Sequence, residues 1–369
     1  MNSASAPLGS TPAPQPASGQ AAASDLEVLR ADLAVDREAI LNLWIENFPD
    51  VPPADHARRF AWFYLDNPMG PGRCWLLRQR STGMIVGTAG LGLRRFHAGK
   101  DTLLGGLASD FAVAKQHRTA LPALLLQRAV LDQLKDDLAL IYTFPNARSM
   151  PIFKRVGYRM IGAPQRWVKV LRVKDYLAKR AAVGWAAPVL GPVLDAARAA
   201  LSTETWRSAN GWKLRPVQSI DDRVNPLVER GLGNLSIYSD RSPQYLDWRY
   251  LRDPLRRFQV FQLESADGQL HGLAVGLLRA DGEFRIIDLV ADPQQAALPI
   301  LLLLVVRAAR QVGARTVAVE GSNLEWLEPE LRKLHFKARQ PNLTCMAMVR
   351  AGGPDLSNWR VLLADEDYN

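Results

Sequence analysis

The stretch LASDFAVAKQHRTALPA, residues 107–123, decides how the fold of this sequence is interpreted. Residues 105–114 are mostly apolar and predict a strand, and residues 120–134 carry apolar side chains at helical spacing. The polar residues between them form a tight turn into the start of that helix. Backbone amides at a helix start, with the helix dipole behind them, favour a phosphate group. The stretch therefore predicts a strand, a turn and a phosphate-binding helix N-terminus.

A second informative stretch follows, FPNARSMPIFKRVGY at residues 144–158. The apolar run 138–144 predicts a strand, residues 149–156 predict a short helix, and residues 157–171 predict a strand that closes the domain. Alternating strands and helices of this kind indicate an α/β domain.

Two segments of the first half return in the second half. AWFYLDNP (residues 61–68) is echoed by DWRYLRDP (247–254), and TALPALLL (119–126) is echoed by AALPILLL (296–303). Gly157-Tyr158 lies 178 residues before His335-Phe336, close to the offset of 177 residues between TALPALLL and AALPILLL. Two matches at nearly one offset predict a duplicated domain.

Length and composition agree with two domains. The chain has 369 residues, and 48% of them are hydrophobic, which is enough for two cores. The predicted parts are a disordered tail rich in Ala, Ser and Pro, a first domain, a helical linker, a degenerate second domain and a C-terminal tail; they span 1–24, 25–173, 174–207, 208–352 and 353–369.

The first domain resembles the GCN5-related N-acetyltransferase (GNAT) superfamily. The quoted stretch offers an apolar strand end, Asp110-Phe111-Ala112-Val113, followed by Arg118 and Ala123 at the family's spacing, although Leu121 stands where the family has Gly. The ending Lys154-Arg155-Val156-Gly157-Tyr158 also matches the family's second block. The resemblance implies two tandem GNAT-like folds, each with a mixed, mostly antiparallel sheet flanked by helices.

The family uses an acyl-CoA, and acetyl-CoA is the expected form here. The resemblance places the cofactor-binding positions in the first domain, at Phe111, Val113, His117, Arg118, Thr119, Ala120, Leu121, Ala123, Asn146 and Phe153.

The resemblance also suggests where catalysis occurs. The backbone of Val113 would polarise the thioester carbonyl, and Asp110 on the same strand would act as a base, or else hold the backbone as a structural residue. Ser149 would assist the leaving thiolate, or else cap its helix. Phe153 stands where the family often has Tyr, so it has no proton to give to the thiolate.

The second copy departs further from the family pattern. Gln295 replaces Arg118, Ile300 replaces Ala123, and Asp292 places a negative charge near the expected phosphate position. These changes predict a substrate-binding or structural role for the second domain.

The remaining sequence features bear on partners and location. The formal net charge is +9, but the basic residues are scattered, which argues against a nucleic-acid partner and suits an anionic substrate. Cys74 and Cys345 have no metal or disulfide spacing, and no metal is expected. With no signal peptide, we expect a cytoplasmic protein. The uncharged run 181–194 is too short to span a membrane, but it could make a peripheral membrane contact.

Three functional hypotheses follow. The first is an acyl-CoA-dependent N- or O-acyltransferase that acts on a small-molecule or saccharide acceptor; similar tandem proteins look like those found with bacterial exopolysaccharide genes. The second is a FemABX-like transferase with an aminoacyl-tRNA donor, and the third is a non-catalytic GNAT-like binding module.

Overall fold

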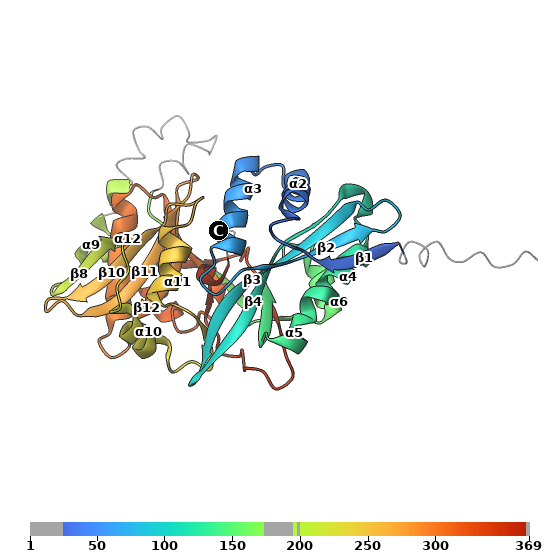
Figure 1. Cartoon of the computed structure of the whole chain (residues 1–369). Helices are drawn as coiled ribbons and strands as arrows, with labels where there is room; N and C mark the ends of the chain where they lie inside the picture. The colour runs from blue at the N-terminus through green and yellow to red at the C-terminus, as the bar shows by residue number, and fades with distance from the viewer. Residues whose placement is uncertain (1–24, 173–194, 198–199, 367–369) are drawn as a thin grey trace, which may run out of the picture.

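The computed structural model describes residues 25–172, 195–197 and 200–366. Two sheets with helices against them lie side by side, each built mainly from antiparallel strands (Figure 1). The predicted α/β fold class is therefore confirmed. The expected tail 1–24 and the apolar run 181–194 lie outside the described residues. Within the described ranges, no helix has the length and apolar character needed to cross a membrane.

The first sheet is built almost entirely from the first half of the chain. Its strand order is β1 (Leu26–Arg30), β2 (Arg73–Gln79), β3 (Ile85–Ala98), β4 (Asp101–Val113), β5 (Leu140–Thr143), β15 (Met346–Val349) and β6 (Arg159–Met160), and β9 (Tyr238–Ser239) pairs with β3. The accompanying helices are α2 (Arg37–Asn47), α3 (Pro53–Phe60), the π-helix η1 (Ala61–Leu65), the 3-10 helix η2 (Lys115–His117), α4 (Ala120–Leu131), α5 (Gln133–Asp136) and α6 (Met150–Val156).

The second sheet repeats this order. It runs β8 (Trp212–Val217), β10 (Gln259–Ser265), β11 (Leu270–Leu278), β12 (Glu283–Ala291), β13 (Thr316–Ser322), β7 (Pro164–Val170) and β14 (Lys337–Arg339), and β16 (Val361–Leu362) pairs with β13. Its helices are α9 (Thr203–Trp206), α10 (Val224–Leu232), α11 (Pro243–Leu246), the π-helix η4 (Asp247–Leu251), α12 (Ala297–Gln311), α13 (Glu328–Lys333) and the 3-10 helix η5 (Leu363–Asp365).

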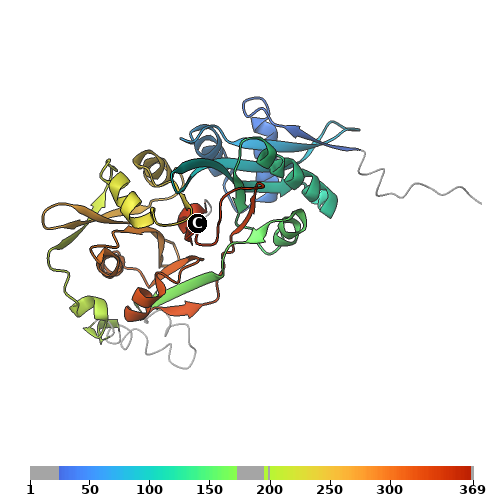
Figure 2. The same cartoon turned by 90° about the horizontal axis from the view of Figure 1, so that it is seen from below.

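The two sheets exchange one strand each. Strand β7 leaves the first half and pairs with β13 and β14, while β15 leaves the second half and pairs with β5 and β6. Figure 2 shows β7 as a green strand among the orange and red strands of the second sheet. Residues 157–171 therefore do not form one closing strand of the first sheet, as the sequence suggested. The chain turns at Gly162, whose φ is +57°, and crosses to the other sheet.

The segment expected to be a C-terminal tail is packed inside the molecule. Trp359, Val361, Leu362 and Leu363 are all buried, and β16 joins the second sheet through pairing with Gly321 and Ser322. In both overall views the red segment that ends at residue 366 lies between the two halves (Figures 1 and 2). The tail expectation fails because these apolar side chains leave water only by filling the space between the sheets.

The echoed segments meet where the two halves join. Both fold as π-helices, η1 and η4, and their Trp62 and Trp248 rings stack with centroids 4.7 Å apart. The indole N–H of Trp62 donates to the backbone carbonyl of Trp248 at 3.0 Å, and that of Trp248 donates to the carbonyl of Trp62 at 3.1 Å. This reciprocal contact fixes the two sheets relative to each other.

Candidate active site

A gap opens in the first sheet where β4 and β5 diverge. The two strands pair in parallel only from Gly105 to Leu107 on β4, although β4 continues along β3 as far as Val113. The hydroxyl of Thr143 donates to the carbonyl of Ala108 at 3.0 Å and closes the base of the gap. A ligand can therefore enter between the strands without breaking the sheet.

The backbone of Val113 faces this gap. The amide of Ala114 donates to the carbonyl of Val86 on β3, and neighbouring residues of an antiparallel strand point their amides in opposite directions. The carbonyl of Val113 accepts a hydrogen bond from Nε of Arg118 at 3.1 Å, on the side away from β3. The Val113 amide thus points where the sequence analysis requires it.

A cavity of about 590 Å³ lies along the gap. Predicted site residues in its lining are Asp110, Phe111, Asn146, Ser149 and Phe153. The other lining residues are Phe48, Val51, Asp55, His56, Arg59, Leu107, Ala108, Ser109, Thr143, Phe144, Pro145, Leu255, Arg256 and Glu366. The last three come from the second half, so both halves enclose the cavity.

Asp110 is buried at the cavity wall and bound by two side chains. Arg59 donates to both carboxylate oxygens at 3.1 Å, and the hydroxyl of Tyr64 donates to one of them at 2.7 Å. Burial raises the pKa of Tyr64 well above its ordinary value, and the charge of Asp110 raises it further, so the phenol keeps its proton. Both oxygens of the Asp110 carboxylate are therefore engaged in hydrogen bonds. The structural reading of Asp110 thus has direct support, through side chains rather than through the backbone.

The short helix α6 brings three predicted residues to the cavity. The side-chain oxygen of Asn146 accepts from the amides of Arg148 and Ser149, both at 3.0 Å, and therefore orders the turn before the helix. The hydroxyl of Ser149 donates to the carbonyl of Asn146 at 3.3 Å. Phe153 is buried edge-on against Phe111. Phe153 has no hydroxyl, whereas Ser149, the residue just before α6, carries one.

The predicted phosphate loop lies at the other end of the gap. The amide of His117 donates to Ala114 and that of Thr119 to His117, so the loop itself uses both. The first-turn amides of Ala120 and Leu121 have no carbonyl one turn back, whereas Pro122 has no amide hydrogen. Two amides at the start of α4 therefore remain as candidate anion donors. Ala123 is buried in the next turn.

Arg118 is positioned by the protein at the mouth of this loop. Besides its bond to Val113, its Nη2 donates to the side-chain oxygen of Asn47 at 2.8 Å. The residue as a whole is exposed. An incoming phosphate would have to share or displace the Asn47 contact, while the bond to Val113 orients the strand end.

The corresponding gap in the second sheet is partly filled. Strands β12 and β13 pair only from Glu283 to Ile286 on β12, and beyond that point β16 pairs with β13 while η5 packs against β12. The second half repeats the tyrosine–aspartate contact, because Tyr250 donates to Asp288 at 3.1 Å. The cavity that Asp288 lines has a volume of about 20 Å³, and a separate cavity of about 220 Å³ lies along the end of β12 and the start of α12.

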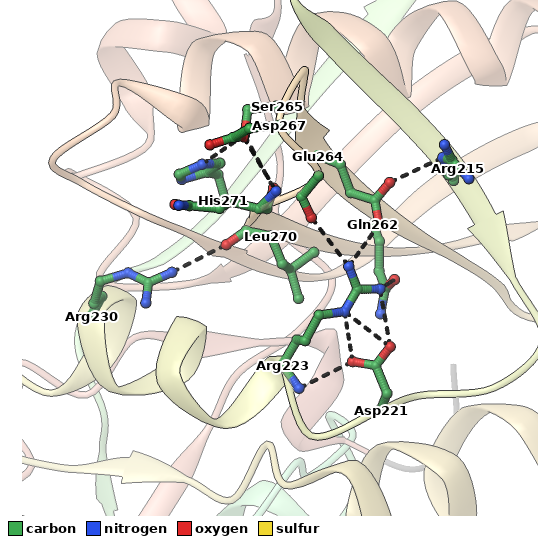
Figure 3. Close-up of polar contacts among 12 residues, drawn as sticks. Arg215, Asp221, Arg223, Arg230, Gln262, Glu264, Ser265, Asp267, Leu270 and His271 are labelled. Carbon is green, nitrogen blue, oxygen red and sulfur yellow. Dashed lines mark hydrogen bonds and ion pairs between the residues drawn. The ribbon is translucent and has the colours of Figure 1, made fainter.

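Asp292 of the second half does not face a phosphate site. Its carboxylate accepts from Nε of Arg230 at 2.8 Å and lies 3.4 Å from Nδ1 of His271. Nε2 of His271 lies 3.1 Å from the hydroxyl of Ser265, which donates to Asp267 (Figure 3). The serine proton is thus directed to a carboxylate at the hairpin turn rather than to the histidine. We interpret these contacts as stabilising the β10–β11 hairpin.

Sequence reasoning did not place Arg59, His56 or Glu366 in the site. Arg59 and His56 lie on α3, where no local pattern marks the side chains that face the cavity. The sequence does mark Arg256, next to Arg257, either as a group that attracts an anionic acceptor or as part of a solvated surface. Glu366 lies in the presumed tail and has no local signal.

No protein-family model matches this sequence, and no curated relative matches it. Solved structures do match: a probable N-acyltransferase from Enterococcus faecalis has a TM-score of 0.62 at 14% identity, covering 88% of this chain and 73% of its own. The two chains share their fold.

Two further structures extend this likeness. A GCN5-related N-acetyltransferase from Anabaena variabilis has a TM-score of 0.58 at 14% identity and covers 88% of this chain and 72% of its own. N-myristoyltransferase from Saccharomyces cerevisiae, solved with bound myristoyl-CoA, has a TM-score of 0.57 at 13% identity and covers 92% of this chain and 85% of its own. At such identities the likeness concerns the GNAT fold, and the chemistry must be argued from the site.

Proposed function

We propose that the protein is an acyl-CoA-dependent acyltransferase that transfers an acyl group to an amine or hydroxyl of a small molecule or saccharide. One observation carries the proposal: the gap between β4 and β5 opens into a cavity of about 590 Å³, whereas β16 and η5 enter the matching gap of the second sheet and the cavities there are smaller, about 20 and 220 Å³. Acetyl-CoA is the first donor to test. An acyl-CoA suits this site because its phosphates and its thioester could bind at the two ends of the same gap.

The residues around the gap suit the steps of the reaction. The first turn of α4 and Arg118 would hold the phosphates, and the Val113 amide would polarise the thioester carbonyl. The acceptor nitrogen then bonds to the carbonyl carbon while the carbon–sulfur bond breaks. An ammonium acceptor loses two protons overall, of which one ends on the CoA thiol and one in solvent.

Proton transfer in this site is assigned to groups that line the cavity. Both carboxylate oxygens of Asp110 already accept hydrogen bonds from Arg59 or Tyr64, so a role as base would run through a bound water. Ser149 supplies a hydroxyl near the place where the family often has a tyrosine. Loss of activity in Ser149→Ala with unchanged acyl-CoA binding would support its assistance to the thiolate.

Thermal-shift titration with acetyl-CoA and longer acyl-CoAs tests the donor. A ligand present at about 100 times its Kd adds about 2.7 kcal/mol to the unfolding free energy, which raises Tm measurably. Arg118→Glu should abolish the shift, because it puts a negative charge beside the phosphates. Gln295→Glu, at the matching position of the second half, should leave the shift intact. No shift with any acyl-CoA at millimolar concentration contradicts the proposal.

A non-catalytic binding module is the second candidate, and Phe153 favours it because a phenyl ring cannot protonate a thiolate. The two proposals separate experimentally. A binding module would show the thermal shift without acceptor-dependent release of CoA thiol, whereas a transferase would show both. An aminoacyl-tRNA donor would give neither result with acyl-CoA.

A further inference from the structure

A small cavity remains where the gap of the second sheet is only partly filled. It has a volume of about 220 Å³ and lies between the ends of α10 and β12, the first turn of α12 and the segments that precede α13 and β16. Two of its described lining residues are charged, Arg230 and Arg360, and none is acidic. A cavity in which all the charged lining residues are positive favours an anionic occupant.

Arg230 already has partners for its guanidinium. Its Nε donates to Asp292 at 2.8 Å, and its Nη2 donates to the carbonyl of Leu270 at 3.1 Å (Figure 3). Asp292 therefore balances the charge of Arg230, and this pair adds little to the attraction of an anion. A preference of the cavity for an anion must come from Arg360.

Arg360 carries a charge that no acidic side chain in the described part of the chain balances. There its guanidinium forms neither a hydrogen bond nor an ion pair, and it lies over the ring of Trp326, with the guanidinium carbon 4.5 Å from the ring centroid. The residue is partly buried, and this burial lowers the pKa of Arg360 with no neighbouring carboxylate to oppose the change. A cation that is partly withdrawn from water is stabilised by an anionic partner.

Other partly buried arginines of the second half do have such partners. Arg285 pairs with Glu283 at 2.9 Å, and Arg310 pairs with Glu204 at 2.7 Å. Stacking on an indole ring holds the guanidinium of Arg360 in place but leaves its N–H donors unused. The difference is expected if a ligand supplies the anion.

The backbone on both sides of Arg360 is fixed by hydrogen bonds. The carbonyl of Trp359 accepts from Nδ2 of Asn323 at 2.8 Å, and Val361 pairs with Ser322 in the second sheet. Trp359 and Val361 are both buried. Because the chain around Arg360 is ordered in advance, binding of an anion there requires little further ordering.

The size of the cavity and its other groups indicate which anion fits. Pockets for drug-sized ligands have volumes of about 300–1,000 Å³, so this smaller cavity suits a small ion or one group of a larger molecule. Leu298, which lines it, lies in the first turn of α12, where backbone amides lack a partner within the helix and the helix dipole favours negative charge. A guanidinium can donate two parallel hydrogen bonds to a phosphate. Donors from two segments suit a phosphate group, which offers more acceptor oxygens than a carboxylate does.

We propose that the second half binds a phosphate group in this cavity, as inorganic phosphate or as part of a small phosphate ester, with Arg360 as the principal ligand-binding residue. This site is separate from the gap between β4 and β5, and it does not depend on the proposed acyltransferase function. It gives the second half a binding role of its own.

Calorimetric titration of the full chain tests the site. The probes are inorganic phosphate and phenyl phosphate, with sodium chloride used to keep the ionic strength constant. We expect saturable binding of at least one probe, and Arg360→Gln should raise its Kd by about tenfold or more, the factor for one lost hydrogen bond to a charged group. Arg360→Lys keeps the charge but loses the paired donors, so its Kd should lie between the two.

Two control variants locate the bound phosphate. Arg252→Gln changes an arginine that pairs with Asp247 and is 75% exposed, and it should leave the Kd unchanged. Arg118→Glu changes the candidate phosphate loop of the first half and should also leave it unchanged. Conversely, Arg360→Gln should keep the thermal shift with acyl-CoA. Phosphate binding that is lost in Arg118→Glu but kept in Arg360→Gln would overturn the assignment.

The remaining outcomes are equally definite. Tighter binding of phenyl phosphate identifies a phosphate ester as the ligand class, and tighter binding of inorganic phosphate identifies the free ion. Absence of saturable binding by both probes at millimolar concentration overturns the proposal, as does acetate binding as tight as that of phosphate. Unfolding curves without phosphate verify that Arg360→Gln folds, and Arg360→Lys provides the test if it does not.

Discussion

The two halves of the molecule share one strand order but differ at the corresponding gap in the sheet. In the first half, the gap between β4 and β5 opens into a cavity, and the Tyr64–Asp110 contact lies at its wall. In the second half, β16 and η5 enter the gap, and the Tyr250–Asp288 contact is covered. The tyrosine–aspartate contact occurs in both halves, so it serves the fold. The first-half gap differs from the partly filled second one in its larger cavity and in the charged residues that line it.

The segment that enters the second gap also shapes the first site. Asp365 accepts from Nη2 of Arg241 at 3.3 Å, and Arg241 pairs with Asp288 at 2.7 Å. Burial raises the pKa of Asp288 above its ordinary value although Arg241 opposes the rise, and the nearby Asp365 adds to it. The next residue, Glu366, then reaches the first-half cavity. The segment that enters the second gap thus also holds Glu366 at the cavity of the first half.

The largest expected effect concerns the contact that holds the halves together. Trp62→Ala and Trp248→Ala should each cost about 3–5 kcal/mol of unfolding free energy, because each removes a large buried ring and leaves a cavity. The double variant should cost less than the sum, by about 0.5–1.5 kcal/mol for the lost ring stack. Urea unfolding of the four proteins measures the cycle.

Trp206→Ala is the control, since that ring is 75% exposed, and it should change stability by less than about 0.5 kcal/mol. Strict additivity of Trp62→Ala and Trp248→Ala would show that the stack does not couple the halves.

The next effect tests a buried charge cluster of the second half. Glu204 in α9 is fully buried and pairs with Lys169 of β7 at 3.0 Å and with Arg310 of α12 at 2.7 Å. Glu204→Gln leaves both cations without their partner and should cost about 3–5 kcal/mol. Glu328→Gln, which removes a partly exposed pair with Arg332, should cost at most about 0.5 kcal/mol.

The pH dependence of that cost has a definite sign. Burial raises the pKa of Glu204, but the hydrogen bonds from Arg310 and Lys169 outweigh it and hold the pKa below its ordinary value of 4.5. The carboxylate therefore contributes stability above pH 4.5, and this contribution is lost as pH falls through the lower pKa of the folded state. The difference in unfolding free energy between Glu204→Gln and the unchanged protein should become smaller below pH 4.5. A difference that stays constant with pH would contradict the lowered pKa.

The local patterns of the sequence carry much of the fold. Residues 107–123 form the expected strand, turn and helix, and the echoed segments form equivalent π-helices, because each depends on neighbours in the chain. The exchange of β7 and β15 depends on which sheet edge is available, and an alternating apolar pattern does not specify its partner. The placement of Arg256 and Glu366 at the cavity depends on packing between the halves, which leaves no local signal.

A smaller effect compares the two tyrosine–aspartate contacts. Tyr64→Phe and Tyr250→Phe each remove one hydrogen bond to a buried carboxylate and should each cost about 1–3 kcal/mol. If the first half alone holds the site, only Tyr64→Phe should also change kcat/KM for acyl transfer, because Asp110 lines the cavity. An equal change of activity in Tyr250→Phe would contradict the assignment of the site to the first half.

The smallest effect concerns one backbone position that both halves share. Gly157 ends α6 with φ at +107°, and the corresponding His335 after α13 has φ at +62°. A side chain in this region costs about 1–2 kcal/mol, partly offset by about 0.5–1 kcal/mol because glycine loses more entropy on folding. We therefore expect Gly157→Ala to destabilise the protein and His335→Gly to stabilise it, each by about 0.5–1 kcal/mol, as measured by urea unfolding.

The two substitutions are expected to change the unfolding free energy in opposite directions. A methyl group at Gly157 would lie 3.5 Å from Met348, an ordinary contact, so backbone strain rather than crowding decides its cost. His335 is exposed, so its imidazole gives up little packing. The second half thus retains the left-handed turn after losing the glycine that suits it. Restoring glycine there should increase stability without altering acyl-CoA binding in the first half, and a decrease in stability would mean that the imidazole holds the turn.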